Sequence, residues 1–167
     1  FHLKPLIRAI TFPHAAHVLA ISENAVRLVE VSADIPAATV KVPNLPKDAA
    51  SAVRKSTIND RSPSGRVQGS EGQKVRLAQY VRKVDAALRT VLAGSSDVPL
   101  ILATTQPVEA IFRSVSSIPA LPQTITGSHD RTSDADLANA ARPILDAHYE
   151  KQISEFRALF DTRKGQR

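Results

Sequence analysis

The side chains able to do chemistry are few and scattered along the chain. The 167 residues include no cysteine, which excludes disulfides, thiolate metal sites and cysteine nucleophiles. His14 and His17 have a spacing that can chelate a metal, but no acidic residue or third histidine lies near them in the sequence. Ser128, His129 and Asp130 are the residue types of a catalytic triad, yet a triad assembles from separated segments. We interpret these three as a turn rich in helix-capping residues, and we expect no metal or other cofactor.

The positive charge of the chain is concentrated in one window. The formal net charge is +6, and residues 54–83 contain eight basic side chains against Asp60 and Glu71. The remaining residues hold 14 basic and 14 acidic side chains and therefore sum to zero. The eight are Arg54, Lys55, Arg61, Arg66, Lys74, Arg76, Arg82 and Lys83. Such a cluster is either a solvated basic face or a surface for a polyanion, since phosphate neutralisation supplies most non-specific affinity for nucleic acids.

Hydrophobic patterning divides the chain into short elements on either side of this window. Residues 1–14 read as the end of a preceding segment, with a helix over 3–10 that Pro13 closes. Strands are predicted at 17–23, 25–31, 38–42, 98–104 and 123–126, and helices at 46–53, 73–93, 107–115 and 135–163. Residues 54–72 lack apolar periodicity and are rich in serine and charge, so we expect an exposed, mobile loop that Gly72 ends.

This order predicts an α/β fold with one mixed five-stranded sheet, an antiparallel meander followed by a βαβ unit, and helices on its faces. The continuous apolar run 98–104 is expected at the centre of the sheet, with the stripe Val81, Val84 and Leu88 packed on it. The topology is that of ribonuclease-H-like proteins. Metal-dependent nucleases of that kind need clustered carboxylates. Because the first strand offers only Glu23 and 98–104 offers none, the sequence argues against such a nuclease.

The last helix is predicted to be longer than the domain needs. Residues 142–167 read as a connector towards a C-terminal domain, and Ile153, Phe156, Leu159 and Phe160 make an apolar stripe on a charged segment. We expect this stripe to be exposed and to pack against a following domain or another copy. The longest apolar runs fall short of the roughly 18 residues of a membrane helix, so no membrane partner is predicted.

The start of the helix at 73–93 carries a family resemblance. A basic, glycine-containing loop ends in Gly72-Gln73 and leads into a helix with the stretch Tyr80-Val81-Arg82-Lys83-Val84. Gly94, the strand at 98–104 and the helix at 107–115 follow in turn. This arrangement resembles the middle domain of the archaeal and eukaryotic class-I release factors and of Pelota, over residues 15–141. More specifically, the chain is similar to the bacterial branch of that superfamily.

The resemblance implies a role and a set of site residues. In the release factors, a Gly-Gly-Gln loop enters the peptidyl-transferase centre, where its glutamine helps water attack the ester that joins peptide to tRNA. Here Gly72 and Gln73 match that motif and Glu71 replaces its first glycine, so we predict weak or no release activity. The resemblance also implies contact with ribosomal RNA or tRNA in the cytoplasm, through Arg54, Lys55, Arg61, Arg66, Lys74 and Arg76.

Three functions are compatible with these residues, and the degenerate Glu71-Gly72-Gln73 motif favours the first of them. The first is a release- or rescue-factor-like domain that binds ribosomal RNA with little or no catalysis. The second is an active peptidyl-tRNA ester hydrolase in which Gln73 positions the water. The third is a protein-interaction module on the same fold. The sequence specifies neither the oligomeric state nor the codon or stall that such a factor would recognise.

Overall fold

The computed structural model of the chain describes residues 15–33, 35–57, 70–94 and 98–164. Along the chain, the elements are β1 (Ala16–Ile21), β2 (Val26–Val31), β3 (Ala38–Val40), α2 (Ala49–Thr57), α3 (Ser70–Leu92), β4 (Leu100–Thr104), α4 (Val108–Val115), β5 (Thr124–Thr126) and α5 (Asp134–Lys164). Each predicted strand and helix within the described ranges is present, with shifts of a few residues at its ends. The predicted helix at 3–10 and most of the predicted loop lie outside these ranges.

The five strands form one mixed sheet in the order β3-β2-β1-β4-β5. β1 pairs antiparallel with β2 and β2 antiparallel with β3, whereas β4 lies parallel to both β1 and β5. The predicted α/β class and mixed sheet are confirmed, and the strand order is consistent with a ribonuclease-H-like topology. The prediction that put 98–104 at the centre is wrong by one strand. β1 is central because β4 enters the sheet beside it, a pairing between segments that lie far apart in the sequence.

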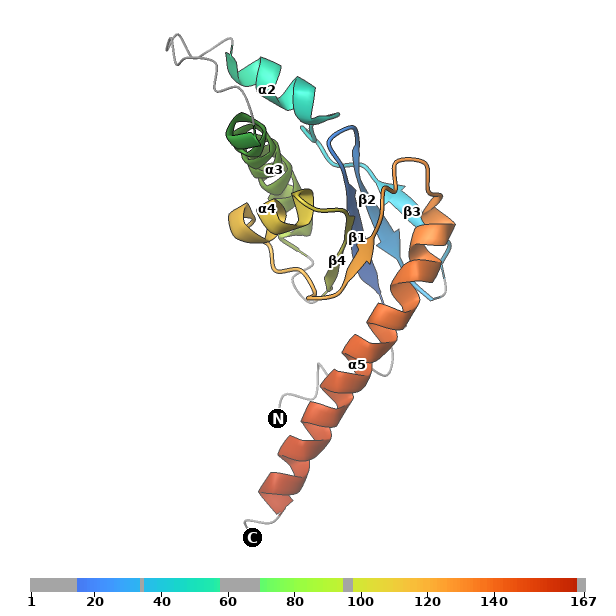
Figure 1. The fold of residues 1–167 in the computed structure, drawn as a ribbon. Helices are drawn as coiled ribbons and strands as arrows, with labels where there is room; N and C mark the ends of the chain where they lie inside the picture. The colour runs from blue at the N-terminus through green and yellow to red at the C-terminus, as the bar shows by residue number, and fades with distance from the viewer. Residues whose placement is uncertain (1–14, 34, 58–69, 95–97, 165–167) are drawn as a thin grey trace.

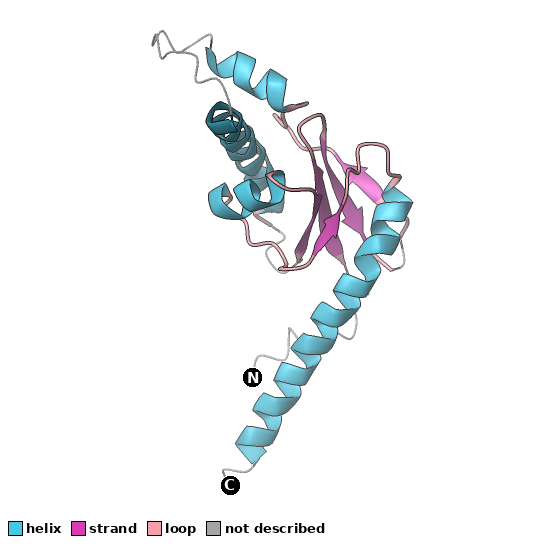
Figure 2. Cartoon of the chain, viewed as in Figure 1, coloured by secondary structure: helices cyan, strands magenta, loops and turns pink. Residues whose placement is uncertain are grey.

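The sheet separates two apolar clusters, and the side-chain alternation of the strands assigns residues to them (Figures 1 and 2). On one face, Leu19 and Leu102 pack with α2, α3 and α4. On the other face, Val18 and Ile101 pack with α5. All six residues of β1 and all five of β4 are buried. The second face of β1 is buried by α5.

Helix α3 provides the largest helical surface of the core. Val81, Val84 and Leu88 are fully buried against the sheet, as the helical spacing predicts, and each contributes roughly 1.5–3 kcal/mol of burial free energy. Val75 is 53% exposed. It lies two residues before the buried Leu77, so the two side chains project about 160° apart around the helix axis. Tyr80 is completely buried, although it was left out of the predicted stripe.

The basic loop is shorter than predicted. α2 continues to Thr57, and α3 begins at Ser70 rather than at Gln73, so only residues 58–69 separate the two helices and these lie outside the described ranges. A glycine costs a helix only about 1 kcal/mol relative to alanine. An acidic residue in the first turn, here Glu71, offsets part of that cost through the helix dipole.

Helix α5 begins beside the sheet and extends well beyond it (Figure 1). Ser133 caps it by accepting the backbone N–H of Asp136 at 3.2 Å, and the helix runs on through Pro143. Its first half buries Leu137, Ala141 and Leu145 against the second face of the sheet. Its outer half carries exposed apolar side chains, as predicted, with Leu159 and Phe160 60% and 65% exposed.

Candidate nucleic-acid interface

The Glu71-Gly72-Gln73 motif forms part of the first turn of α3. Glu71 and Gln73 are exposed, whereas Gly72 is buried. The amide Nε2 of Gln73 donates a hydrogen bond to Oε1 of Glu23 at 3.0 Å. The side-chain amide is therefore held by a residue 50 positions earlier, in the turn between β1 and β2. Sequence analysis predicted a loop up to Gly72 and a helix from Gln73, whereas Glu71 and Gly72 are already helical. Gln73 also has a carboxylate partner that the sequence did not predict.

The turn between β1 and β2, which carries Glu23, is held by hydrogen bonds within the turn and to α2. Oγ of Ser22 accepts the backbone N–H groups of Asn24 and Ala25 at 3.2 and 3.1 Å. The carbonyl of Glu23 accepts the N–H of Ala49 at 2.9 Å, which ties the turn to the start of α2. The beginnings of α2 and α3 therefore meet at this end of the sheet, and Glu23 contacts both.

Cationic side chains surround the first turns of α3. Lys74, Arg76 and Arg82 are exposed, and Lys74 lies 3.4 Å from the carboxylate of Glu71. Lys74 and Arg76 are two positions apart, so they project about 160° apart around the helix axis. Lys83 is half-buried and donates a hydrogen bond to the carbonyl of Ala52 on α2. The cations thus lie along the first four turns of α3, with Lys83 bracing α3 against α2.

The remaining predicted RNA-binding residues are placed only in part. Arg54 and Lys55 belong to α2, which ends two residues later. Arg61 and Arg66 lie outside the described residues. Of the six predicted contacts, the structure therefore places Lys74 and Arg76 at the same exposed helix end as Gly72 and Gln73.

Tyr80 is a buried polar residue that sequence analysis named only as part of the resemblance at 80–84, not as a core residue. Its hydroxyl is buried and has no hydrogen-bond partner among the described residues. Burial raises the pKa of this phenol, and the negative charges of Asp48 and Asp130 add to the effect. The helical spacing from Leu77 could have placed Tyr80 in the core, since the two residues are one turn apart.

Asp85 is the second missed residue, and it joins α3 to the end of α4. Its side chain is only 3% exposed. It accepts hydrogen bonds from Oγ of Ser116 at 2.6 Å, from the backbone N–H of Ser117 at 3.2 Å and from the guanidinium of Arg89 at 2.6 Å. Burial alone would raise the pKa of Asp85, but the donors Ser116 and Arg89, the charge of Arg89 and the Ser117 N–H together lower it. The available signal was its position, because Asp85 lies four residues after Val81 on the apolar face of the predicted helix.

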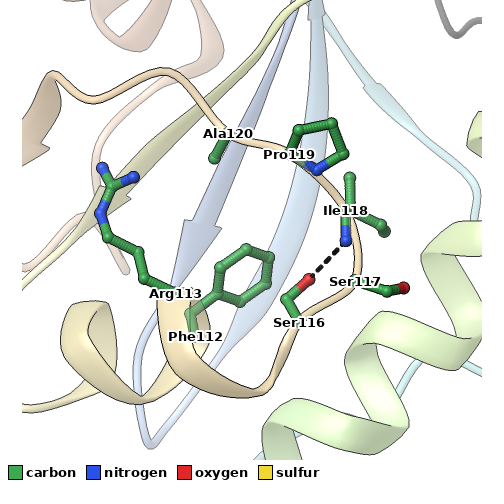
Figure 3. A pocket seen from close by; sticks show the side chains of 7 residues that line it. All are labelled: Phe112, Arg113, Ser116, Ser117, Ile118, Pro119 and Ala120. Atoms are coloured by element: carbon green, nitrogen blue, oxygen red, sulfur yellow. Dashed lines mark hydrogen bonds between the residues drawn. The ribbon is translucent and has the colours of Figure 1, made fainter.

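A shallow cavity of about 260 Å³ follows the end of α4 (Figure 3). Phe112, Arg113 and Ser116–Ala120 line it. Its polar groups already have partners: Ser116 Oγ accepts the N–H of Ile118 at 3.1 Å, and Arg113 donates to the carbonyl of Leu121 at 2.9 Å. The cavity borders Asp85, about three turns along α3 from Gln73, so it is not part of the helix-end surface.

The histidines do not form a metal site in the described part of the chain. No group of three or more metal-binding side chains is found among those residues, and His14 lies outside them. His17 is buried, and its Nδ1 finds no described hydrogen-bond partner. Burial lowers the pKa of His17, against the opposing charge of Glu30. Ser128, His129 and Asp130 form part of a turn. Nδ1 of His129 lies 3.2 Å from Oγ1 of Thr132, and Oδ1 of Asp130 accepts a hydrogen bond from the hydroxyl of Ser22 at 2.6 Å.

The fold and the site together define an α/β domain that displays a cationic helix end beside the carboxyl edge of its central strand. None of the described helices is long and apolar enough to cross a membrane. The sequence matches bacterial archaeo-eukaryotic release factor family 11 over residues 13–151, and the chain belongs to this family. The match confirms the resemblance to the bacterial branch of the release-factor superfamily. The comparison with curated proteins found no match.

Proposed function

We propose that this chain is a ribosome-associated, release- or rescue-factor-like domain that contacts ribosomal RNA or tRNA with little or no catalysis. The cationic helix end, made of Lys74 and Arg76, would contact the phosphates together with Arg82 farther along α3. Arg54, Lys55, Arg61 and Arg66 on the preceding segment would add further contacts. Family membership supports a release-factor-like role. The single observation that carries the RNA-facing part is the position of the entire charge excess, at residues 54–83.

The cations near the start of α3 are only partly balanced by negative charge. Lys74 and Arg76 lie in the second turn of α3, and Glu71 is the acidic residue of its first turn. An RNA phosphate at this end would be stabilised by the side chains and by the helix dipole together.

Two features of the motif support weak or absent ester hydrolysis. Glu71 occupies the position of the first glycine of the family motif, and its exposed carboxylate would repel the phosphates around a tRNA ester. The Gln73 amide donates to Glu23, so one of its N–H groups is engaged before any substrate arrives. A glutamine that acts on an attacking water needs its amide free and pre-oriented.

Ribosome co-sedimentation over a salt series tests the proposal. The variant Arg61→Ser/Arg66→Ser/Lys74→Ser/Arg76→Ser removes four predicted phosphate contacts. We expect weaker binding at every salt concentration, with the slope of log K against log salt reduced by roughly 0.7–0.9 per lost contact at most. The variant should retain the circular dichroism spectrum of the parent, because Lys74 and Arg76 are exposed and neither belongs to the apolar clusters.

A matched control removes four exposed cations from the opposite side of the sheet. Arg142→Ser/Lys151→Ser/Arg157→Ser/Arg163→Ser changes the net charge equally but acts on α5. If both variants lose the same affinity for ribosomes, binding depends on the total charge of the chain and the interface assignment is wrong. If the first variant binds like the parent, the RNA-facing proposal fails and the protein-interaction alternative takes its place.

A further inference from the structure

The outer half of α5 carries an apolar stripe that no described element covers. Leu137, Ala141 and Leu145 are buried against the sheet, and Tyr149 packs at the edge of the same cluster. The spacing of three to four residues continues outward through the outer stripe, which consists of Ile153, Phe156, Leu159 and Phe160. None of these four belongs to either apolar cluster. Figure 1 shows this part of the helix extending away from the sheet without a labelled element beside it.

Exposure rises along the outer stripe. Ile153 and Phe156 are half-buried, whereas Leu159 and Phe160 are 60% and 65% exposed. Two exposed residues of this size, one turn from two half-buried ones, form a contiguous apolar surface rather than scattered single side chains. Such a surface is expected to have a partner.

The structure shows which part of the chain arrives at this surface. The hydroxyl of Tyr149 donates a hydrogen bond to the carbonyl of Ala15 at 3.0 Å. Ala15 is the first described residue, so the described part of the chain begins next to the inner end of the outer stripe. The 14 residues before it lie outside the described ranges. Their sequence has apolar side chains at Leu3, Leu6, Ile7 and Ile10, which is the spacing of one face of a helix.

We propose that the segment 3–10 docks on the outer stripe of α5, runs antiparallel to that helix and covers the apolar side chains of the stripe. The dimensions agree. Leu3 and Ile10 are seven residues apart, as are Ile153 and Phe160, so two helices would present apolar faces of the same length, about 10 Å. Running back from Ala15, Ile10 then lies near Ile153 and Leu3 near Phe160.

A tethered segment satisfies this surface better than a second copy of the chain. Aromatic side chains bury about 150–250 Å² each, so four residues, two of them already half-buried, offer far less than the roughly 800 Å² per partner of a stable interface. A segment joined to the domain at Ala15 faces the stripe at an effective concentration of about millimolar. The same small area is therefore enough within one chain. This inference is independent of the proposed RNA contact, which lies on the other face of the sheet.

Engineered cysteine pairs test the docking directly, because the natural chain has no cysteine. The pairs Ile10→Cys/Ile153→Cys and Leu3→Cys/Phe160→Cys should form intramolecular disulfides under mild oxidation of dilute protein. Ile10→Cys/Ala158→Cys is the matched control, since Ala158 is exposed and lies on the opposite side of α5 from Phe156. We expect at least tenfold faster closure in the two test pairs, scored by non-reducing gel and peptide mass spectrometry.

Hydrogen exchange provides a second measurement in a chain without cysteines. Ile7→Asp should release the segment and speed amide exchange at 153–163 by tenfold or more, while Arg8→Asp, at a polar position of the same segment outside its apolar face, should not. Exchange in β1 and β4 reports whether the core stays folded. Equal closure rates in test and control pairs, or unchanged exchange in Ile7→Asp, would overturn the proposal. Cross-links between chains, with a dimer by light scattering, would assign the stripe to a second copy instead.

Discussion

Replacing Asp85 with alanine should destabilise the domain by about 2–3 kcal/mol at neutral pH. The carboxylate is 3% exposed and accepts hydrogen bonds from Ser116 and Ser117 at the end of α4, and each hydrogen bond to a charged group contributes about 1.5–3 kcal/mol. Its ion pair with Arg89 adds less than about 1 kcal/mol, because the Arg89 side chain is 61% exposed and screened by water. The alanine variant no longer incurs the cost of burying a carboxylate, and this gain reduces the net loss of stability to about 2–3 kcal/mol.

The effect should depend on pH in a defined direction. The pKa of Asp85 is lowered in the folded protein, so its contribution is fully present above the pKa of an unfolded aspartate, about 3.9. It is lost as the pH falls through the folded pKa. The difference in unfolding free energy between the parent and Asp85→Ala should therefore be constant from pH 6 to 7 and should shrink below pH 4.

Urea unfolding at several pH values, followed by circular dichroism, measures this difference. Arg89→Ala is the control, and it should cost less than about 1 kcal/mol. A double-mutant cycle with Ser116→Ala should return a coupling of at least about 0.5 kcal/mol, since the two side chains are in contact at 2.6 Å. A loss below about 0.5 kcal/mol for Asp85→Ala, or a loss that does not change with pH, would refute the assignment of Asp85 as the connection between α3 and α4.

The other predictions concern the helix end and the core. Glu71→Gly should raise peptide release from stalled ribosomes above background only if the family chemistry is latent, and Gln73→Ala in that background should abolish the gain while leaving ribosome binding intact. Leu88→Ala should cost about 2–5 kcal/mol in urea unfolding, against less than about 0.5 kcal/mol for the exposed Val75→Ala. Tyr80→Phe should leave stability unchanged or raise it by up to about 1 kcal/mol, because it removes a buried hydroxyl without a described partner; a clear loss would show that the hydroxyl is hydrogen-bonded.

Local patterns were sufficient to predict the elements of this domain. Val81, Val84 and Leu88 recur with the period of a helix, and the run from Leu100 to Thr104 is apolar at nearly every position, so burial is encoded within each segment. The location of the charge excess and the resemblance at residues 80–84 are also local, and they were enough to indicate the family.

The tertiary structure decided what depends on contacts between distant segments. Three such contacts join residues separated by 31 or more positions. They are the pairing of β1 with β4, which makes β1 central, the hydrogen bond from Gln73 to Glu23 and the hydrogen bond from Ser116 to Asp85. No periodicity within one segment contains that information, because it arises from how strands order in the sheet and how helices pack on it. The start of α3 at Ser70 has a related origin: the cost of one glycine is smaller than what the first turn gains around it, so the predicted loop residues Glu71 and Gly72 became helical.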